Sequence, residues 1–134
     1  MSNAEFLSQW HKAVVDKDYD ILDDLLAENV EFHSPTLWKP KEGKDITKYI
    51  LMVISQLFED FKYHRQFELD SSFGLEFSAK VEGKALKGID LIRLNDEGKI
   101  EHFEVMIRPL NTLNLIFEKM TAELQAAGFL PKDL

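Results

Sequence analysis

Hydrophobic and polar residues alternate with a period of two along the second half of the chain. The alternation covers residues 61–69, 75–82, 87–94 and 99–108, and short runs rich in Gly, Asn, Asp and Ser separate these segments. Alternation bounded by such residues is typical of strands joined by tight turns. The clearest pair is the last one, joined by the turn at residues 95–98, which closes on Gly98. The pattern therefore predicts four consecutive antiparallel strands.

The first half of the chain shows helical periodicity instead. Apolar residues spaced by three and four predict a first helix that follows a capping box at Ser2 and ends near residues 16–17. A short second helix begins after Asp18 or Asp20. A third helix runs from residue 44 or 45 to about residue 58. Residues 30–34 alternate like a strand that Pro35 ends, and a loop over 36–43 follows.

A last helix is predicted after Pro109, and Gly128 closes it. The element order is then helix, helix, strand, helix, four strands and helix. Helices and strands that are segregated in this way predict an α+β fold, with helices packed on one face of a curved, mostly antiparallel sheet. A length of 134 residues fits one domain over residues 1–134, and no linker or repeat divides it.

Composition and charge limit the kinds of binding partner that the chain is expected to have. The net charge of −8 and pI near 5.0 argue against binding to nucleic acid, which needs clustered Lys and Arg. The apolar runs are too short for a membrane span, and no secretory signal is visible. The absence of cysteine excludes disulfides and thiolate metal sites and fits a cytoplasmic location. Because no phosphate-binding glycine loop is visible, no cofactor is expected.

Asp90 breaks the alternation of its strand. It shares a face with Ile92 and Leu94, so a carboxyl group is predicted to lie among apolar neighbours. An ionised carboxyl group is costly to bury without a partner, so Asp90 should be hydrogen-bonded, protonated, or placed where a ligand binds. It is either an acid with a raised pKa or a pocket residue satisfied by Trp10 or by water.

Other residues are weaker candidates. The Trp10 indole N–H can bind a ligand oxygen, although a tryptophan on a buried helix face is more often core. His33 is the natural base near the predicted pocket rim, yet alternation places it on the face opposite Phe32 and Ser34, as a surface or interface residue. His102 and Glu104 share a face, but two residues make an incomplete metal site, so no metal is predicted.

The element order, together with the motifs at residues 32–35 and 88–90 and the turn at 95–99, resembles the nuclear transport factor 2-like superfamily. Within it, the chain resembles the SnoaL-like proteins and the ketosteroid isomerases. The resemblance implies a cone-shaped, strongly bent sheet wrapped around the long third helix, with a pocket at the wide end. It also implies a homodimer formed through the outer sheet face.

Only some of the functional residues of the ketosteroid isomerases have a matching residue in this chain. Asp90 falls where ketosteroid isomerases carry a protonated aspartic acid that binds the developing oxyanion. Trp10 stands where they carry the oxyanion tyrosine, and Ser34 stands where they carry the catalytic aspartate. A serine hydroxyl without an activating partner is a poor base near neutral pH, so steroid isomerisation by the family mechanism is not expected.

The expected function is binding of a small, mostly apolar molecule whose polar group meets Asp90 and Trp10. The walls of the expected pocket combine aromatic, aliphatic and polar side chains, namely Ser34, Trp38, Tyr49, Phe77, Ile92, Phe103 and Val105. If the chain is an enzyme, the resemblance implies cofactor-free proton transfer of isomerase, cyclase or dehydratase type, with Asp90, Trp10 and His33 as candidate catalytic residues. A non-catalytic ligand-binding protein and a protein-interaction module remain the alternatives.

Overall fold

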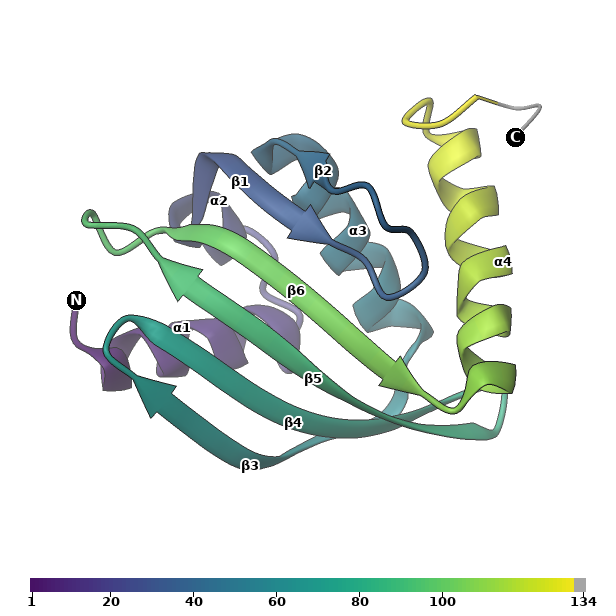
Figure 1. The fold of residues 1–134 in the computed structure, drawn as a ribbon, viewed down its shortest axis with the longest axis horizontal. Coiled ribbons are helices and arrows are strands. Elements are labelled where there is room, and N and C mark those ends of the chain that lie inside the picture. Colours follow the sequence, from purple (N-terminus) through teal and green to yellow (C-terminus); the bar gives the residue numbers. More distant parts are fainter. Residues whose placement is uncertain (132–134) are drawn as a thin grey trace.

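The computed structural model describes residues 1–131 and has the predicted α+β architecture (Figure 1). In chain order the elements are α1 (Asn3–Val14), α2 (Ile21–Leu25), β1 (Leu26–His33), β2 (Lys41–Glu42), α3 (Lys44–Leu57), β3 (Glu59–Leu69), β4 (Ser72–Val81), β5 (Lys84–Leu94), β6 (Ile100–Arg108) and α4 (Leu110–Ala126). The predicted order of helices and long strands is therefore confirmed, and the short β2 is an addition inside the predicted loop.

The strands form one six-stranded, unclosed sheet in the order β2-β1-β6-β5-β4-β3. The pairings are antiparallel except between β1 and β6, which run parallel. The sheet is strongly curved. The helices α1, α2 and α3 lie on one face of it, and α4 stands at one end (Figure 1). The concave face and the helices together enclose the interior of the protein.

Two boundaries differ from the sequence prediction. Helix α1 begins as expected, with the Ser2 hydroxyl accepting a hydrogen bond of 3.1 Å from the Glu5 amide, but it ends at Val14. The chain reverses just beyond it, where Lys17 adopts a left-handed φ of 60°. Strand β1 begins at Leu26, earlier than predicted, because Leu26 ends the apolar pattern of α2 and also starts the buried side of the strand.

The turn between β5 and β6 explains why this hairpin is visible in the sequence. The Asn95 side-chain oxygen accepts hydrogen bonds from the amides of Glu97 and Lys99, at 2.9 and 3.0 Å. Gly98 has a φ of 78°, which a residue with a side chain rarely adopts. Local chemistry alone therefore sets the register that carries Asp90 to the inner face of the sheet.

Aromatic side chains fill the narrow end of the fold, between α1 and the sheet. Phe6 stacks on Phe73 with ring centroids 5.0 Å apart, and Trp10 packs against Phe103 at 5.3 Å. Ile92 belongs to the same buried cluster and is 2% exposed. This end is packed as core, so the remaining interior space lies toward the opposite end, under α3 and α4.

Gly88 permits a close approach of side chains across the sheet. It lies opposite Phe77 of β4 and Ile107 of β6. A Cβ atom at this position would lie 2.5 Å from Cζ of Phe77 and 2.7 Å from the Met106 carbonyl oxygen. Only glycine leaves room for the Phe77 ring in its observed position, where it forms part of the inner wall.

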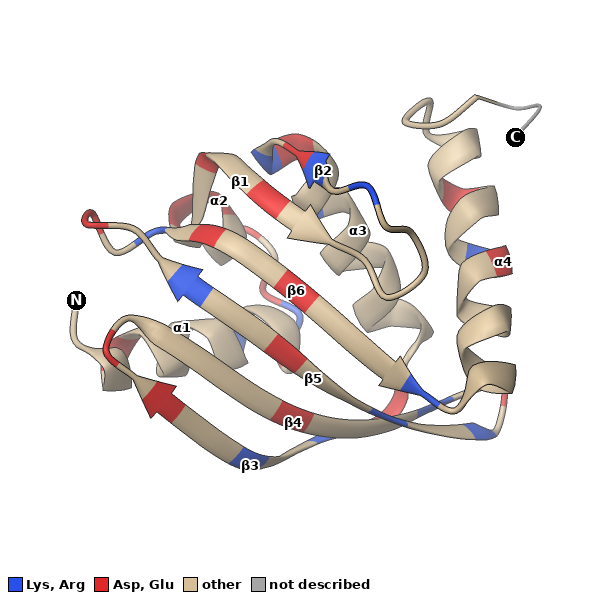
Figure 2. Ribbon diagram, viewed as in Figure 1, with Lys and Arg blue, Asp and Glu red and all other residues tan. Residues whose placement is uncertain are grey.

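Of the charged residues among 1–131, only Glu76 and Asp90 are buried. Acidic positions recur on both of the neighbouring strands β1 and β6 (Figure 2). Among residues 1–131 no helix combines the length and the apolar character that crossing a membrane requires.

Candidate functional site

A cavity of about 310 Å³ lies between the concave sheet face and the helices α3 and α4. Most of its wall is apolar. The sheet contributes Phe77 and Phe103, α3 contributes Leu51, and α4 contributes Ile116 and Met120. A space with this lining favours a ligand that is largely hydrophobic.

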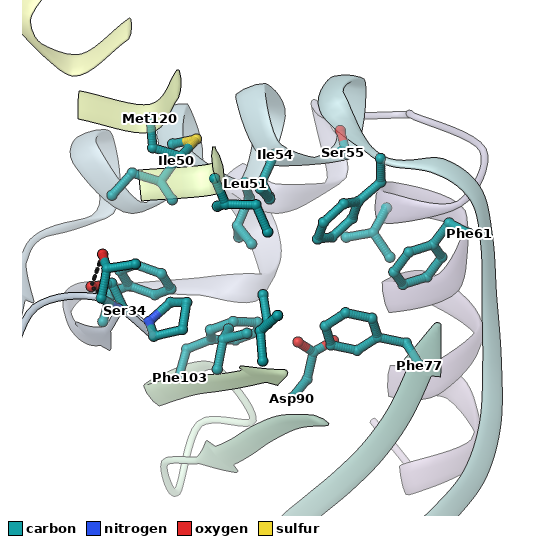
Figure 3. A pocket seen from close by; sticks show the side chains of 18 of the residues that line it. Ser34, Ile50, Leu51, Ile54, Ser55, Phe61, Phe77, Asp90, Phe103 and Met120 are labelled. Carbon is teal, nitrogen blue, oxygen red and sulfur yellow. Dashed lines mark hydrogen bonds between the residues drawn. The ribbon is translucent and has the colours of Figure 1, made fainter. Parts of the chain in front are cut away.

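Asp90 projects from β5 into this apolar interior. In the sheet it lies opposite Leu75 of β4 and Val105 of β6, and it is only 6% exposed. Figure 3 shows its carboxyl group between the rings of Phe77 and Phe103, directed into the space between the sheet and α3. Burial disfavours the charged form and raises the pKa of Asp90 from 3.8 to about 7, while the hydrogen bond from Tyr63 partly opposes the rise.

Two further side chains form a directed chain of hydrogen bonds to Asp90. The Trp10 indole N–H donates to the Tyr63 hydroxyl oxygen at 2.9 Å, and the Tyr63 hydroxyl donates to Oδ2 of Asp90 at 2.8 Å. Trp10 therefore acts on Asp90 through Tyr63 and not by direct contact. Burial and the neighbouring Asp90 charge raise the pKa of Tyr63 well above its ordinary value, so Tyr63 keeps its proton.

The ring of Tyr63 is held on its other side. His11 of α1 stacks on it with ring centroids 5.0 Å apart, and burial lowers the pKa of His11. The neighbour is thus an uncharged imidazole near neutral pH, which leaves the Asp90 carboxylate without a cationic partner in this chain of contacts. Burial, which no positive charge in these contacts offsets, raises the pKa of Asp90.

This arrangement can hold or move one proton. With a pKa of about 7, both forms of Asp90 are populated near neutral pH. The neutral acid can donate a hydrogen bond to a ligand oxygen, and the carboxylate can accept a proton from a ligand. Among the described residues that line the cavity, Lys17, Lys41 and Asp60 are the other charged ones, and none of them is buried.

The structure brings six of the sequence-predicted residues to the cavity wall, namely Trp10, Ser34, Phe77, Asp90, Phe103 and Val105. Ser34 lies at the end of β1, where its hydroxyl oxygen accepts hydrogen bonds from the amides of Leu37 and Thr36, at 3.0 and 3.4 Å. The hydroxyl group thereby holds the loop that follows. It has no basic side chain to activate it among the hydrogen bonds of the described residues.

Two other predicted site residues, His33 and Ile92, do not line the cavity. Strict alternation along β1 turns His33 to the outer sheet face, where Nε2 lies 3.0 Å from Oε1 of Glu31. His33 therefore does not line the cavity, contrary to its predicted place at the pocket rim. Ile92 is on the same face as Asp90 but two residues closer to the narrow end, where the aromatic core covers it.

Trp38 and Tyr49, which the sequence predicts in the pocket wall, also lie outside it. Trp38 is 98% exposed, because the turn at residues 34–37 directs Pro35 and Leu37 to the cavity and leaves Trp38 in solvent. Tyr49 lies on the side of α3 that meets the end of α4. Its ring packs on Phe129 at 5.4 Å, and its hydroxyl group donates to the Glu123 carbonyl oxygen at 3.4 Å.

Tyr63 is the residue of the candidate site that the sequence analysis does not single out. The sequence does contain a signal for Tyr63. Tyr63 lies two residues after Phe61 on a predicted strand, so both side chains are expected on the same face. A tyrosine facing the interior needs a partner for its hydroxyl group, and Asp90 needed a donor. The pairing was not visible because β3 and β5 are separated by β4, and only the bend of the sheet brings the two side chains together.

The structure of a steroid delta-isomerase from Pseudomonas aeruginosa is 40% identical to this chain, with a TM-score of 0.87 and 92% of each chain covered. The chain belongs to the ketosteroid isomerase-like, SnoaL-like proteins of the nuclear transport factor 2-like superfamily. A second solved structure similar to this chain is that of an uncharacterised bacterial protein with a cystatin-like fold from Silicibacter pomeroyi. It is 33% identical, with a TM-score of 0.85, and the match covers 90% of this chain and 85% of the other.

A more distant nuclear transport factor 2-like protein of unknown function, from Cytophaga hutchinsonii, is 20% identical with a TM-score of 0.67, and the match covers 84% of this chain and 96% of the other. It shows the shared fold alone. No protein-family model matches this ketosteroid isomerase-like chain, and no curated protein does.

Proposed function

We propose that this ketosteroid isomerase-like protein binds a small, mostly apolar molecule in its cavity and uses Asp90 for cofactor-free acid/base chemistry of isomerase, cyclase or dehydratase type. One observation carries the proposal: among the described residues of the cavity wall, Asp90 is the one buried carboxyl group, it has a pKa of about 7, and most of the wall around it is apolar. A titratable group perturbed in this way, in a concave apolar site, is typical of catalytic and binding sites.

The cavity size supports a small-molecule ligand. Its volume of about 310 Å³ is at the small end of the range of roughly 300–1,000 Å³ that is usual for ligand pockets. The apolar wall would supply affinity through burial of hydrophobic surface, and the acid would orient one polar group of the ligand. The relative that is called a steroid delta-isomerase is named for a substrate of this apolar type.

The proton chemistry can be written with Asp90 alone. Its carboxylate takes a proton from a carbon next to a ligand carbonyl group, and the bonding electron pair moves toward the carbonyl oxygen. The neutral acid then returns the proton to another atom of the ligand, so no redox partner is needed. Tyr63 stabilises the carboxylate stage through its hydrogen bond, and Trp10 fixes the orientation of Tyr63.

The proposed chemistry differs from that of the ketosteroid isomerases at Ser34, which by the resemblance stands where they carry the catalytic aspartate. Its hydroxyl group accepts hydrogen bonds from backbone amides and cannot act as the proton-abstracting base at that position. We therefore expect the chain to isomerise a steroid substrate no faster than buffer does. A rate enhancement that disappears in Asp90→Asn would show that the activity named for the relative extends to this chain.

The first experiment identifies the ligand. Native protein is purified without denaturation, its small molecules are extracted and analysed by mass spectrometry, and each is added back to ligand-free protein. Asp90→Asn should weaken binding or turnover of the recovered molecule about 100-fold. Asp96→Asn, on the exposed turn of the same hairpin, is the matched control and should bind as the wild type does. Equal binding and turnover by Asp90→Asn would contradict the proposed role.

A non-catalytic ligand carrier is the second candidate. It is favoured by the hydrogen-bonded state of Ser34, which leaves Asp90 as the one buried carboxyl group among the described residues of the cavity wall. The two candidates differ in one result, since the carrier releases the recovered molecule unchanged and the enzyme converts it. The homodimer implied by the resemblance stays a prediction, which light scattering of the purified chain would test.

A further inference from the structure

The outer face of the sheet carries a second group of chemically active side chains, remote from the cavity. In the parallel pair of β1 and β6, Glu31 lies opposite His102 and His33 lies opposite Glu104. The residues between them, Phe32 and Phe103, are 3% and 1% exposed and point to the core. Alternation therefore directs all four polar side chains outward, in a two-by-two square on adjacent strands.

The side chains of this square are already close together. Ligand atoms of Glu31, His33 and His102 all lie within 4.8 Å of one another. Nε2 of His33 is 3.0 Å from Oε1 of Glu31, and Nε2 of His102 is 3.4 Å from Oε1 of Glu104. The centroids of the two imidazole rings lie 4.6 Å apart, and the ring planes are tilted by 30°. Each histidine thus has a carboxylate beside it and the other histidine within reach.

The electrostatics of the square favour a cation. With neutral imidazoles the four side chains carry two negative charges on a chain of net charge −8. The nearest basic residue by register is Arg93, opposite His102 on β5, but its Nε is 3.6 Å from Oε1 of Glu101. The four side chains are 23–43% exposed, so they are partly desolvated and still open to an ion from solution.

We propose that Glu31, His33 and His102 bind a divalent transition-metal ion, of which Zn²⁺ fits best, and that Glu104 completes the site. Two imidazole nitrogens with carboxylate oxygens form a usual zinc donor set, whereas Ca²⁺ and Mg²⁺ prefer sites made of oxygen alone. The ion would take the place of the hydrogen bonds that now join each histidine to a carboxylate.

Only side-chain movements are needed. Tetrahedral zinc with bonds of about 2.0–2.2 Å sets its ligand atoms roughly 3.3–3.6 Å apart. The observed upper separation of 4.8 Å can be closed by rotation of the Glu31 and His102 side chains, since the backbone register is fixed by the sheet. An ion here would clamp β1 to β6, the one parallel pair among the strands of residues 1–131, and would not touch Asp90, which faces inward.

From the sequence alone no metal is predicted, because His102 and Glu104 make an incomplete site. The other half of the square is about seventy residues earlier in the chain, and nothing local shows that β1 pairs in parallel with β6. The tertiary pairing supplies the missing ligands.

The test uses the full chain, without an affinity tag and treated with a chelator. It is titrated with ZnCl₂ in a calorimeter, and bound zinc is counted after equilibrium dialysis. The wild type should bind one Zn²⁺ per chain and melt at a higher temperature when loaded. His33→Gln and His102→Gln should each weaken binding at least tenfold. His64→Gln is the control, because His64 lies exposed on β3 and bonds to the Ser78 hydroxyl.

Co²⁺ gives an independent readout. A site of this donor set should give visible ligand-field absorption with Co²⁺ in the wild type and in His64→Gln, and this absorption should be lost in both variants of the square. The proposal is overturned if the wild type takes up no stoichiometric zinc, or if His33→Gln and His102→Gln bind it as tightly as His64→Gln does. Asp90→Asn should keep full zinc affinity, so failure of the cavity proposal would leave this one standing.

Discussion

The Tyr63 hydroxyl group donates a hydrogen bond of 2.8 Å to Oδ2 of Asp90, although the two residues lie on strands separated by a third. In a flat sheet this separation would be about twice the strand spacing of roughly 4.8 Å, too far for direct contact between side chains that stand perpendicular to it. The curvature of the sheet tilts both side chains toward the same interior point. The bend of the fold therefore creates the polar end of the cavity.

Removal of the Tyr63 hydroxyl group should raise the pKa of Asp90 above 7. The hydrogen bond stabilises the carboxylate, so in Tyr63→Phe the acid holds its proton more strongly. Carboxyl ¹³C chemical shifts measured against pH report this directly. The Trp10 N–H also loses its acceptor, at a cost of about 1–3 kcal/mol in unfolding free energy. Tyr49→Phe is the control, because its hydroxyl group makes only a long bond at the α4 end, and it should leave the Asp90 pKa in place.

Asp90→Asn should change how stability depends on pH. In the wild type the folded pKa of about 7 exceeds the ordinary value of 3.8, so the folded state binds the proton more tightly. Stability from this group is fully present below pH 4 and is lost as pH rises through 7. The difference corresponds to roughly 4 kcal/mol at most. Urea unfolding from pH 4 to 8 should show that Asp90→Asn gains stability relative to wild type as pH rises.

Asp96→Asn is the matched control for this series. Its carboxyl group is exposed on the turn of the same hairpin, so its stability difference from wild type should stay nearly constant with pH. A flat difference for Asp90→Asn as well would mean that Asp90 titrates alike in the folded and unfolded chains, against the burial argument.

Gly88→Ala should disturb the cavity wall. The added Cβ would lie 2.7 Å from the Met106 carbonyl oxygen and 2.5 Å from the Phe77 ring, and a backbone atom in a sheet cannot easily move aside. We expect a loss of about 1–3 kcal/mol in unfolding free energy and a displaced Phe77 ring, visible as altered aromatic NMR shifts. At Gly74 an added Cβ meets only ordinary contacts of 3.6 Å or more, so Gly74→Ala should be much milder. Similar losses in both variants would refute the steric explanation.

The features that sequence predicted well are local ones. The β5–β6 hairpin rests on Asn95 and Gly98, which determine its turn, and alternation then places Asp90 inward without any knowledge of tertiary structure. Helical periodicity and the Ser2 cap located α1 in the same way. These local signals predict the fold class and the inward position of Asp90, which is one of the two residues of the Tyr63–Asp90 hydrogen bond.

The features that it missed depend on distant parts of the chain. Tyr63 reaches Asp90 only because the sheet bends, and His33 meets His102 only because β1 pairs in parallel with β6. Trp38 was misplaced because an aromatic residue in a loop carries no signal of which way the loop turns, and the Ser34 hydrogen bonds set that direction. Long-range pairing and loop geometry leave no periodic trace in a single sequence.

The most direct test of the account is the titration of the Asp90 carboxyl group itself. Protein labelled with ¹³C at aspartate carboxyl carbons is followed by NMR from pH 3 to 9, and the Asp90 resonance is assigned as the one missing from Asp90→Asn. The account predicts a midpoint near pH 7. A midpoint near 4, the value of an aspartate in water, would show a solvated carboxylate and would contradict the proposed acid/base site.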